Sequence, residues 1–159
     1  MSEESSSPPT DSEERAAGSV QAVYDRIADH FASTRAYAWP EVESFVTAVA
    51  DHDGLGRALD LGCGNGRHTE LLAEHDADAI GVDVSRGLLS AAATRRRDHG
   101  FAAALVQGDA ATLPFADATF DQIVYVATLH HLRPEATRRQ SLAELGRLLR
   151  PGGLALVSA

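Results

Sequence analysis

Asp60-Leu61-Gly62-Cys63-Gly64-Asn65-Gly66 is the stretch of sequence that decides the fold. It follows a short apolar segment, 57–61, that predicts a strand, and it precedes 67–75, which predicts a helix. Glycines at such a junction let the backbone turn sharply and approach a ligand closely, and the start of the helix offers unpaired N–H groups. The stretch therefore predicts a ligand-binding turn between a strand and a helix.

The spacing of the glycines separates two classes of ligand. A dinucleotide-binding loop has its third glycine where this chain has Arg67. An anionic Asp60, two residues before Gly62, fits poorly beside a pyrophosphate and well near an ammonium group. The loop therefore favours a ligand with a methionine moiety over a dinucleotide.

Segments on either side of the loop alternate between strand and helix. A continuous apolar run such as 120–127 suits a strand that is covered on both faces. The expected strands are 57–61, 79–84, 103–107, 120–127 and 154–157, and the expected helices are 67–75, 85–99 and 134–149, with two more that begin near Gly18 and at Pro40 and a tight turn at 150–153. This alternation predicts an α/β fold with a parallel, Rossmann-like sheet and helices on both faces.

The two ends of the chain differ in character from this core. Residues 1–16 are rich in Ser, Glu and Pro and predict a disordered acidic tail, and 17–159 predicts one domain. The chain stops within or just after the fifth expected strand, so we expect a domain that is truncated there. The first residues lack the pattern of a signal peptide, and no apolar run reaches the roughly 18 residues that would cross a membrane. We therefore expect a cytoplasmic protein without a membrane partner.

Acidic residues also follow the second and third expected strands. Asp83 comes 23 residues after Asp60, and Asp109 follows the strand 103–107. An acid at the end of the second strand can accept both ribose hydroxyls of an adenosine, and Asp109 can accept from the adenine amino group. A single acid at a strand end is more often a helix cap or a solvated side chain. Three of them beside a glycine loop predict a nucleoside site along one crevice.

Composition limits the environment and the partners. The net charge is −9, and all 14 cationic side chains are arginine, which is typical of a protein adapted to high salt and also of high-GC codon usage. The acidic balance argues against broad binding of nucleic-acid phosphates, although a local arginine-lined site is compatible with it. Cys63 is the single cysteine, so a disulfide within the chain and a cysteine-based metal cluster are excluded.

These motifs resemble those of the class I S-adenosylmethionine-dependent methyltransferases. The resemblance covers 56–157 and includes Leu113-Pro114-Phe115 and Leu149-Arg150-Pro151-Gly152-Gly153. It implies S-adenosylmethionine as the cofactor and a seven-stranded family sheet whose final hairpin this chain lacks. The implied cofactor-binding residues are Asp60, Gly62, Cys63, Gly64, Asn65 and Gly66 in the loop, Asp83 and Val84 after the second strand, Asp109 and Ala110 after the third, and Ala127 after the fourth.

A narrower resemblance lies outside this core. The segment 23–35, followed by Trp39-Pro40, and the segment 126–131 are similar to those of the tRNA wobble-uridine methyltransferases, including the methyltransferase domain of the AlkB-type wobble-uridine enzyme. That group esterifies 5-carboxymethyluridine at the first anticodon position. The resemblance implies a tRNA substrate and a small zinc-binding activator subunit as a partner.

The chemistry of that reaction points to particular side chains. A substrate carboxylate is already ionised at neutral pH, so the site needs alignment, desolvation and a cation that selects the substrate. Arginine can bind a carboxylate with two hydrogen bonds, which makes Arg35 the first candidate, followed by His30 and His131. The alternative for Arg35 is a salt bridge to Asp25, Asp29 or Glu41. The alternative for His130 and His131 is that one packs beneath the ligand loop and the other is a core or surface histidine. No third clustered ligand accompanies the His130-His131 pair, so we expect no metal.

Two other functions remain open from the sequence. A small-molecule methyltransferase, acting on a quinone or lipid precursor, would share the core motifs and would suit the acidic charge. A truncated, non-catalytic domain that binds the cofactor weakly or serves only as a partner subunit is the other alternative.

Overall fold

The structure, a computed structural model, describes residues 36–158. The predicted tail at 1–16 and the helix expected from Gly18 lie outside the described residues. The helices are α2 (Pro40–His52), α3 (Arg67–Glu74), α4 (Arg86–His99), the short 3₁₀ helix η1 (Leu129–His131) and α5 (Glu135–Leu148), and the strands are β1 (Arg57–Leu61), β2 (Asp78–Asp83), β3 (Ala104–Gln107), β4 (Phe120–Val126) and β5 (Leu149–Ser158). Most of these boundaries lie within one or two residues of those expected from the sequence.

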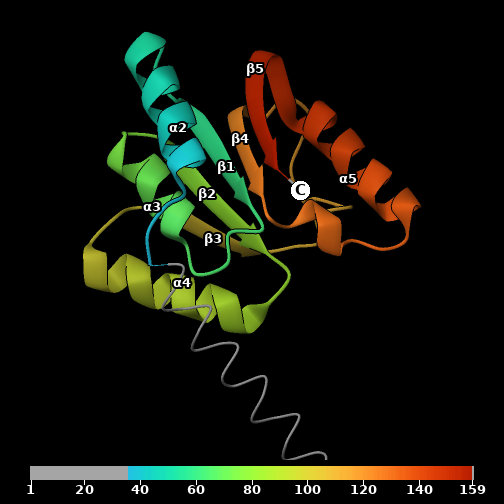
Figure 1. Cartoon of the computed structure of the whole chain (residues 1–159), viewed down its shortest axis with the longest axis horizontal. Helices are drawn as coiled ribbons and strands as arrows, with labels where there is room; N and C mark the ends of the chain where they lie inside the picture. Colours follow the sequence, from blue (N-terminus) through green and yellow to red (C-terminus); the bar gives the residue numbers. More distant parts are fainter. Residues whose placement is uncertain (1–35, 159) are drawn as a thin grey trace, which may run out of the picture. The chain divides into compact units, whose positions relative to one another are not determined.

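The five strands form one parallel sheet in the order β3-β2-β1-β4-β5 (Figure 1). In the middle of the sheet, Leu59 of β1 pairs with Ile80 of β2 on one side and with Ile123 of β4 on the other. The chain leaves β1 toward one edge and returns through β4 toward the other, so the strand order reverses beside β1. The predicted parallel α/β sheet is confirmed, and its ligand crevice is expected at this reversal.

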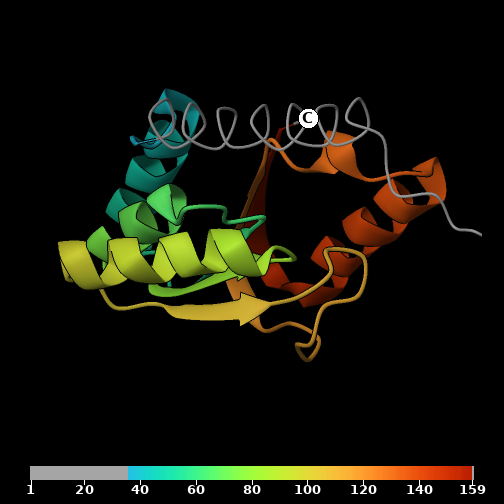
Figure 2. The ribbon, with the colours of Figure 1, turned by 90° about the horizontal axis from the view of Figure 1, so that it is seen from below.

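Helices cover both faces of the sheet, as predicted. Figure 1 shows α2 and α3 on one side of the sheet and α5 on the other, and Figure 2 shows α4 running beside β3. Leu145 and Leu148 of α5 pack on Phe120, Ile123 and Tyr125 in one core. The second core joins α2 and α3 to the opposite face through Val42, Val46, Leu72, Val124 and Val126. The strand β4 is therefore buried on both faces, which explains its uninterrupted apolar run.

Local signals set the helix ends. Pro40 occupies the first turn of α2, where a missing N–H costs nothing. The Ser85 hydroxyl caps α4 by accepting a hydrogen bond from the Leu88 N–H at 3.2 Å, and Gly100 ends that helix in the left-handed conformation. Among residues 36–158, no helix is both long enough and apolar enough to span a membrane.

The fifth strand differs from the prediction. We expected a separate tight turn at 150–153 and a strand from Leu154, but β5 begins at Leu149 and includes the turn. Leu149 pairs with Phe120 and Leu154 pairs with Gln122, so the register shifts across the intervening residues. The glycine Gly152, with a φ of +81°, lets the chain make this irregularity without leaving its neighbour β4.

Candidate functional site

A cavity of about 320 Å³ opens at the carboxyl ends of β1, β2 and β3. This is the edge at which parallel α/β sheets bind their ligands. The cavity is lined by Leu61, Gly62, Val82, Asp83, Val84, Gly108, Asp109, Ala110, Thr128, His131, Leu132, Arg133 and Thr137. Five of the eleven predicted cofactor-binding residues are in this set, and so is His131.

The glycine loop is fastened to the end of β2. The backbone N–H groups of Gly62 and Cys63 both donate to the Val82 carbonyl, at 2.8 and 2.9 Å. Gly62 has a φ of +71°, and a Cβ atom placed there would lie 2.2 Å from Thr128 Oγ1. Only glycine fits this position, because the backbone conformation and the close approach of the loop after β4 both exclude a side chain.

Asp83 closes the loop from the second strand. Its Oδ2 accepts a hydrogen bond from the Gly64 N–H at 3.0 Å, and its Oδ1 accepts one from the Ser85 N–H at 2.8 Å. The residue is only 9% exposed, yet it lines the cavity. Each carboxylate oxygen has a further lone pair, so Asp83 can shape the loop and accept from two ligand hydroxyls at once.

Asp60 lies beneath the loop and does not line the cavity. It is 1% exposed, and its Oδ2 accepts a hydrogen bond from the Thr69 hydroxyl at 2.7 Å. Burial raises the pKa of Asp60 to about 6, against the lowering effects of the Thr69 hydrogen bond and the nearby Arg67 charge. Its charge can therefore act on a ligand only across the loop, and it is sensitive to pH in the weakly acidic range.

The other loop positions also lie outside the cavity lining. Cys63 is buried, and burial together with the acids Asp60 and Asp83 raises the pKa of its thiol, so the sulfur stays neutral. Gly64 bonds to Asp83 as described, and Asn65 and Gly66 lead into α3. Ala127, with a φ of +54°, follows β4 and also stands outside the lining. The roles predicted for these residues remain predictions.

The wall after β3 is made by Asp109 and Ala110. Asp109 is exposed, and its Oδ1 accepts a hydrogen bond from the Ala111 N–H at 2.8 Å while its carbonyl accepts from the Thr112 N–H at 3.0 Å. The Ala110 carbonyl accepts from the buried Ser141 hydroxyl at 2.8 Å. The acid that is predicted to meet adenine therefore sits on a turn that helix α5 holds from behind.

The opposite wall contains residues that the sequence analysis did not select. Thr128, Leu132, Arg133 and Thr137 all line the cavity, and they follow the end of β4. Arg133 is exposed and makes no hydrogen bond or ion pair within residues 36–158. Their position in the sequence could have identified them, because the segment after β4 lies at the same sheet edge as the ends of β1 and β2.

Neither histidine of the His130-His131 pair packs in the interior. His130 and His131 are both exposed, with ring centroids 3.9 Å apart, so neither packs beneath the loop. His131 lines the cavity and His130 does not. The other two predicted catalytic residues, Arg35 and His30, lie outside the described residues. Within residues 36–158, no group of three or more His, Cys, Asp or Glu side chains is arranged to hold a metal ion.

The cavity joins hydrogen-bond acceptors on one side to an arginine and a histidine on the other. Asp83 and Asp109 offer carboxylates where the ends of β2 and β3 meet, and His131 and Arg133 approach from the segment after β4. The acceptors suit the hydroxyl and amino donors of a nucleoside, and a cation at the other wall suits an anionic group. The geometry can therefore hold a nucleoside and present it to an anionic molecule.

Known proteins with similar sequences share most of this chain. It is 34% identical over 139 residues to a tRNA (carboxymethyluridine(34)-5-O)-methyltransferase of Arabidopsis thaliana, covering 87% of this chain and 32% of the relative. The enzymes of the same name from Xenopus tropicalis and Saccharomyces cerevisiae are 38% and 33% identical, again across 87% of this chain, which spans 20% and 46% of them. The chain thus spans less than half the length of these curated relatives.

Solved structures and a family model agree with the fold. An S-adenosylmethionine-dependent methyltransferase from Clostridium acetobutylicum superposes with a TM-score of 0.68 at 23% identity, covering 84% of this chain and 56% of that one. One from Methanosarcina mazei gives 0.64 at 25% identity, covering 75% and 56%. The model of the methyltransferase domain matches residues 58–153, more than half of the chain. The chain belongs to the methyltransferase domain family.

Proposed function

We propose that this chain binds S-adenosylmethionine in the cavity and methylates the carboxylate of 5-carboxymethyluridine at the tRNA wobble position. One observation carries the proposal: Asp83 and Asp109 both line the same cavity, beside the glycine loop. Membership of the methyltransferase family supports the reaction class. The names of the relatives from Arabidopsis thaliana and Saccharomyces cerevisiae support the substrate.

The residues of the cavity fit the cofactor part by part. Asp83 accepts from the ribose hydroxyls through the lone pairs that Gly64 and Ser85 leave available. Asp109 accepts from the adenine amino group, with Ala110 beside it. The glycine loop passes close to the methionine part, and the buried Asp60 favours its ammonium group electrostatically. The close approach at Gly62 leaves room for backbone contact and none for a side chain.

The reaction asks the protein for alignment rather than for a base. When bound, the cofactor supplies a methyl group that passes from its sulfonium sulfur to a carboxylate oxygen, with the C–S bond breaking as the C–O bond forms. The carboxylate is ionised at neutral pH, so no side chain must remove a proton. The protein contributes by holding the two reactants in line and by excluding water from between them.

Basic side chains at the second wall select the substrate in this proposal. Arg133 and His131 line the cavity, and Arg133 has no competing partner within residues 36–158. An arginine can bind a carboxylate or a phosphate through two hydrogen bonds. Arg35 and His30 remain candidates for the same role from the segment that the structure does not describe.

The proposal also includes a partner protein, a cellular location and an alternative acceptor. We infer a small zinc-binding activator as a partner, which rests on the similarity to the wobble-uridine methyltransferases alone. A cytoplasmic location and adaptation to high salt are part of the proposal, the latter because of the acidic, lysine-free composition. A small-molecule acceptor is the second candidate, because a net charge of −9 opposes long-range attraction of tRNA.

The proposal is tested in two steps. The first is a calorimetric titration of S-adenosylhomocysteine into the purified chain in molar salt, for which we expect micromolar binding. The second follows labelled methyl from S-adenosylmethionine into tRNA carrying carboxymethyluridine, with the free nucleoside and unmodified tRNA as controls. Binding without transfer to the tRNA would favour the small-molecule acceptor, and a folded chain that binds nothing would favour the non-catalytic alternative.

A further inference from the structure

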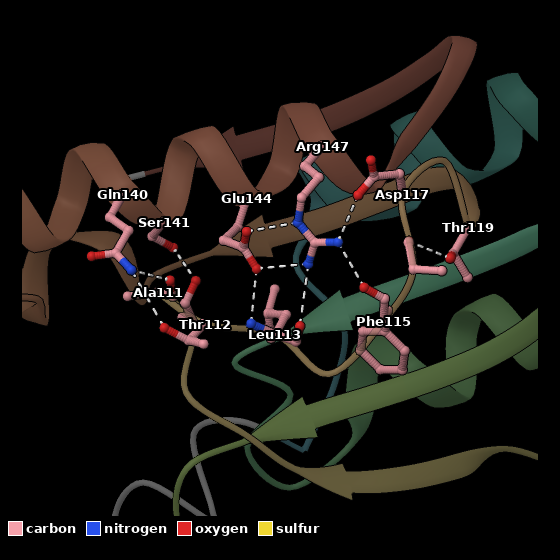
Figure 3. A network of polar contacts seen from close by, with 12 residues as sticks. Ala111, Thr112, Leu113, Phe115, Asp117, Thr119, Gln140, Ser141, Glu144 and Arg147 are labelled. Atoms are coloured by element: carbon pink, nitrogen blue, oxygen red, sulfur yellow. Dashed lines mark hydrogen bonds and ion pairs between the residues drawn. The ribbon is translucent and has the colours of Figure 1, made fainter.

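One face of α5 is devoted to the loop that follows β3. Gln140, Ser141, Glu144 and Arg147 recur at positions that share a helix face, and Figure 3 shows all four pointing at the segment 110–117. This segment begins at Ala110 in the cavity wall and has few backbone hydrogen bonds of its own. Side chains of α5 therefore supply hydrogen bonds to the backbone of this loop that neighbouring strands supply within a sheet.

Ser141 makes the contact nearest the cavity. It is fully buried, and its hydroxyl donates to the Ala110 carbonyl at 2.8 Å. Tyr125 Oη lies 2.8 Å from the same Ser141 oxygen and must be the donor there, because the single hydroxyl hydrogen of Ser141 is used on a carbonyl. A buried chain of hydroxyls thus runs from β4 through α5 to the residue after Asp109.

Glu144 and Arg147 hold the rest of the loop. Glu144 accepts from the Leu113 N–H at 2.8 Å and from two nitrogens of Arg147 at 2.8 and 2.9 Å. Arg147 also donates to the carbonyls of Phe115 and Leu113, at 2.7 and 3.2 Å. These hydrogen bonds lower the pKa of Glu144 to about 2, so the pair stays charged across the neutral range.

Gln140 adds a contact at the exposed rim of the same face. Its Nε2 donates to the Ala111 carbonyl at 2.8 Å. Ser141, Gln140 and Arg147 therefore fix the carbonyls of residues 110, 111, 113 and 115, while Glu144 fixes the N–H of residue 113. The first of these carbonyls stands in the cavity wall. A wall whose backbone is fixed before the ligand arrives loses less conformational entropy on binding.

We propose that Ser141 is a positioning residue for base recognition: by fixing Ala110 it aims Asp109 at the exocyclic amino group of the bound adenine. The inference rests on the proposed nucleoside site and adds a residue that touches no ligand. The inference predicts a change in base specificity. Loss of the Ser141 contact should reduce discrimination between adenine and hypoxanthine, which carries a carbonyl where adenine has the amino group, as well as reducing affinity.

The test measures two affinities for each protein. S-Adenosylhomocysteine and its hypoxanthine analogue are titrated into the wild-type chain, Ser141→Ala and Tyr125→Phe. We expect the wild type to prefer the adenine compound, and Ser141→Ala to lose roughly tenfold in affinity for it, the scale of one buried hydrogen bond. Affinity for the analogue should change less, so the ratio falls. Tyr125→Phe is the matched control, because it deletes the neighbouring hydroxyl and leaves the Ala110 contact in place.

Two further variants separate positioning from general damage. Ser141→Ala leaves the Tyr125 hydroxyl without its acceptor, and the double variant with Tyr125→Phe removes that orphan, so the ratio should stay low in the double variant. Gln140→Ala changes an exposed residue, keeps the core intact and should lower the ratio in the same direction by a smaller factor. A wild-type chain that binds neither compound would overturn the proposed nucleoside site. A wild type that discriminates, with unchanged discrimination in Ser141→Ala, would overturn this inference alone.

Discussion

The carboxylate of Asp83 accepts a hydrogen bond from the backbone N–H of Gly64 at 3.0 Å, which ties the end of β2 to the middle of the glycine loop. The two residues are 19 positions apart in sequence, and both are buried. The acid that is expected to hold the ribose is therefore also part of the scaffold that shapes the loop.

This double role predicts two effects of Asp83→Ala. Loss of two acceptors for ribose hydroxyls should weaken S-adenosylhomocysteine binding by about 100-fold, and the orphaned Gly64 N–H should lower the free energy of unfolding by about 1–3 kcal/mol. Calorimetry and urea unfolding measure the two effects. Asp121→Ala is the matched control, because Asp121 also accepts a backbone N–H, from Arg57 at 3.0 Å, at the other end of the sheet. It should lower stability and leave binding unchanged; equal losses of binding in both variants would refute the ribose assignment.

Asp60 predicts a pH dependence of stability. Its pKa is raised from 3.8 to about 6 in the folded chain, so the folded state binds the proton more tightly than the unfolded state does. The stability that this group contributes is present below pH 4 and is lost as the pH rises through 6, a change of about 3 kcal/mol. Urea unfolding between pH 4 and 7 measures it, with Asp60→Asn as the control in which this component disappears. A wild-type profile identical to that of Asp60→Asn would contradict the assignment.

The same carboxyl predicts a pH dependence of binding. A ligand ammonium near Asp60 favours its ionised form, so binding should release a proton and strengthen between pH 5 and 7. Titrations of S-adenosylhomocysteine in buffers of different ionisation enthalpy measure that proton directly. 5′-Methylthioadenosine, which has no amino-acid part, is the matched ligand and should show no such release. Equal proton release with both ligands would rule out the ammonium role.

A substitution at Gly62 tests whether the close approach of the loop to Thr128 matters for stability. Gly62→Ala should destabilise the chain by about 2–5 kcal/mol, because the φ of +71° is strained for alanine and the new methyl meets Thr128 Oγ1. Gly100→Ala shares the positive φ, at +70°, but has open space around it, so only the strain of about 1–2 kcal/mol should appear. Adding Thr128→Ala to Gly62→Ala should recover part of the difference. Equal losses at the two glycines would mean that the contact with Thr128 is unimportant.

A substitution at Arg133 tests whether the arginine of the second wall binds the tRNA substrate. Arg133→Gln should raise the KM for tRNA carrying carboxymethyluridine by roughly tenfold or more, while the affinity for S-adenosylhomocysteine stays within about twofold, because a charged hydrogen bond contributes about 1.5–3 kcal/mol. Arg139→Gln is the control, since Arg139 pairs with Glu135 on the exposed side of α5 and does not line the cavity. A larger loss of cofactor affinity than of tRNA affinity would move Arg133 from the substrate to the cofactor.

Much of the fold followed from local patterns in the sequence. The apolar run at 120–127 predicted a strand covered on both faces, and β4 is buried against α5 on one side and against α2 and α3 on the other. The helix expected at 85–99 is found as α4, which Ser85 caps at its start and Gly100 ends in the left-handed conformation. The error at β5 has a physical reason: a proline and two glycines predict a turn, but pairing with β4 continues around the irregularity.

The sequence by itself determined the glycine loop, the strand-end acids Asp83 and Asp109, and hence the edge of the sheet at which a nucleoside is expected, since parallel strands bring their carboxyl ends together. Only the tertiary structure decided that Asp60 is buried under the loop, that Arg133 faces the cavity and that Ser141 holds Ala110. These contacts join residues far apart in the chain, up to 31 positions between Ala110 and Ser141. Periodicity reports which face of an element is buried, whereas the atom that a polar side chain reaches depends on how the elements pack.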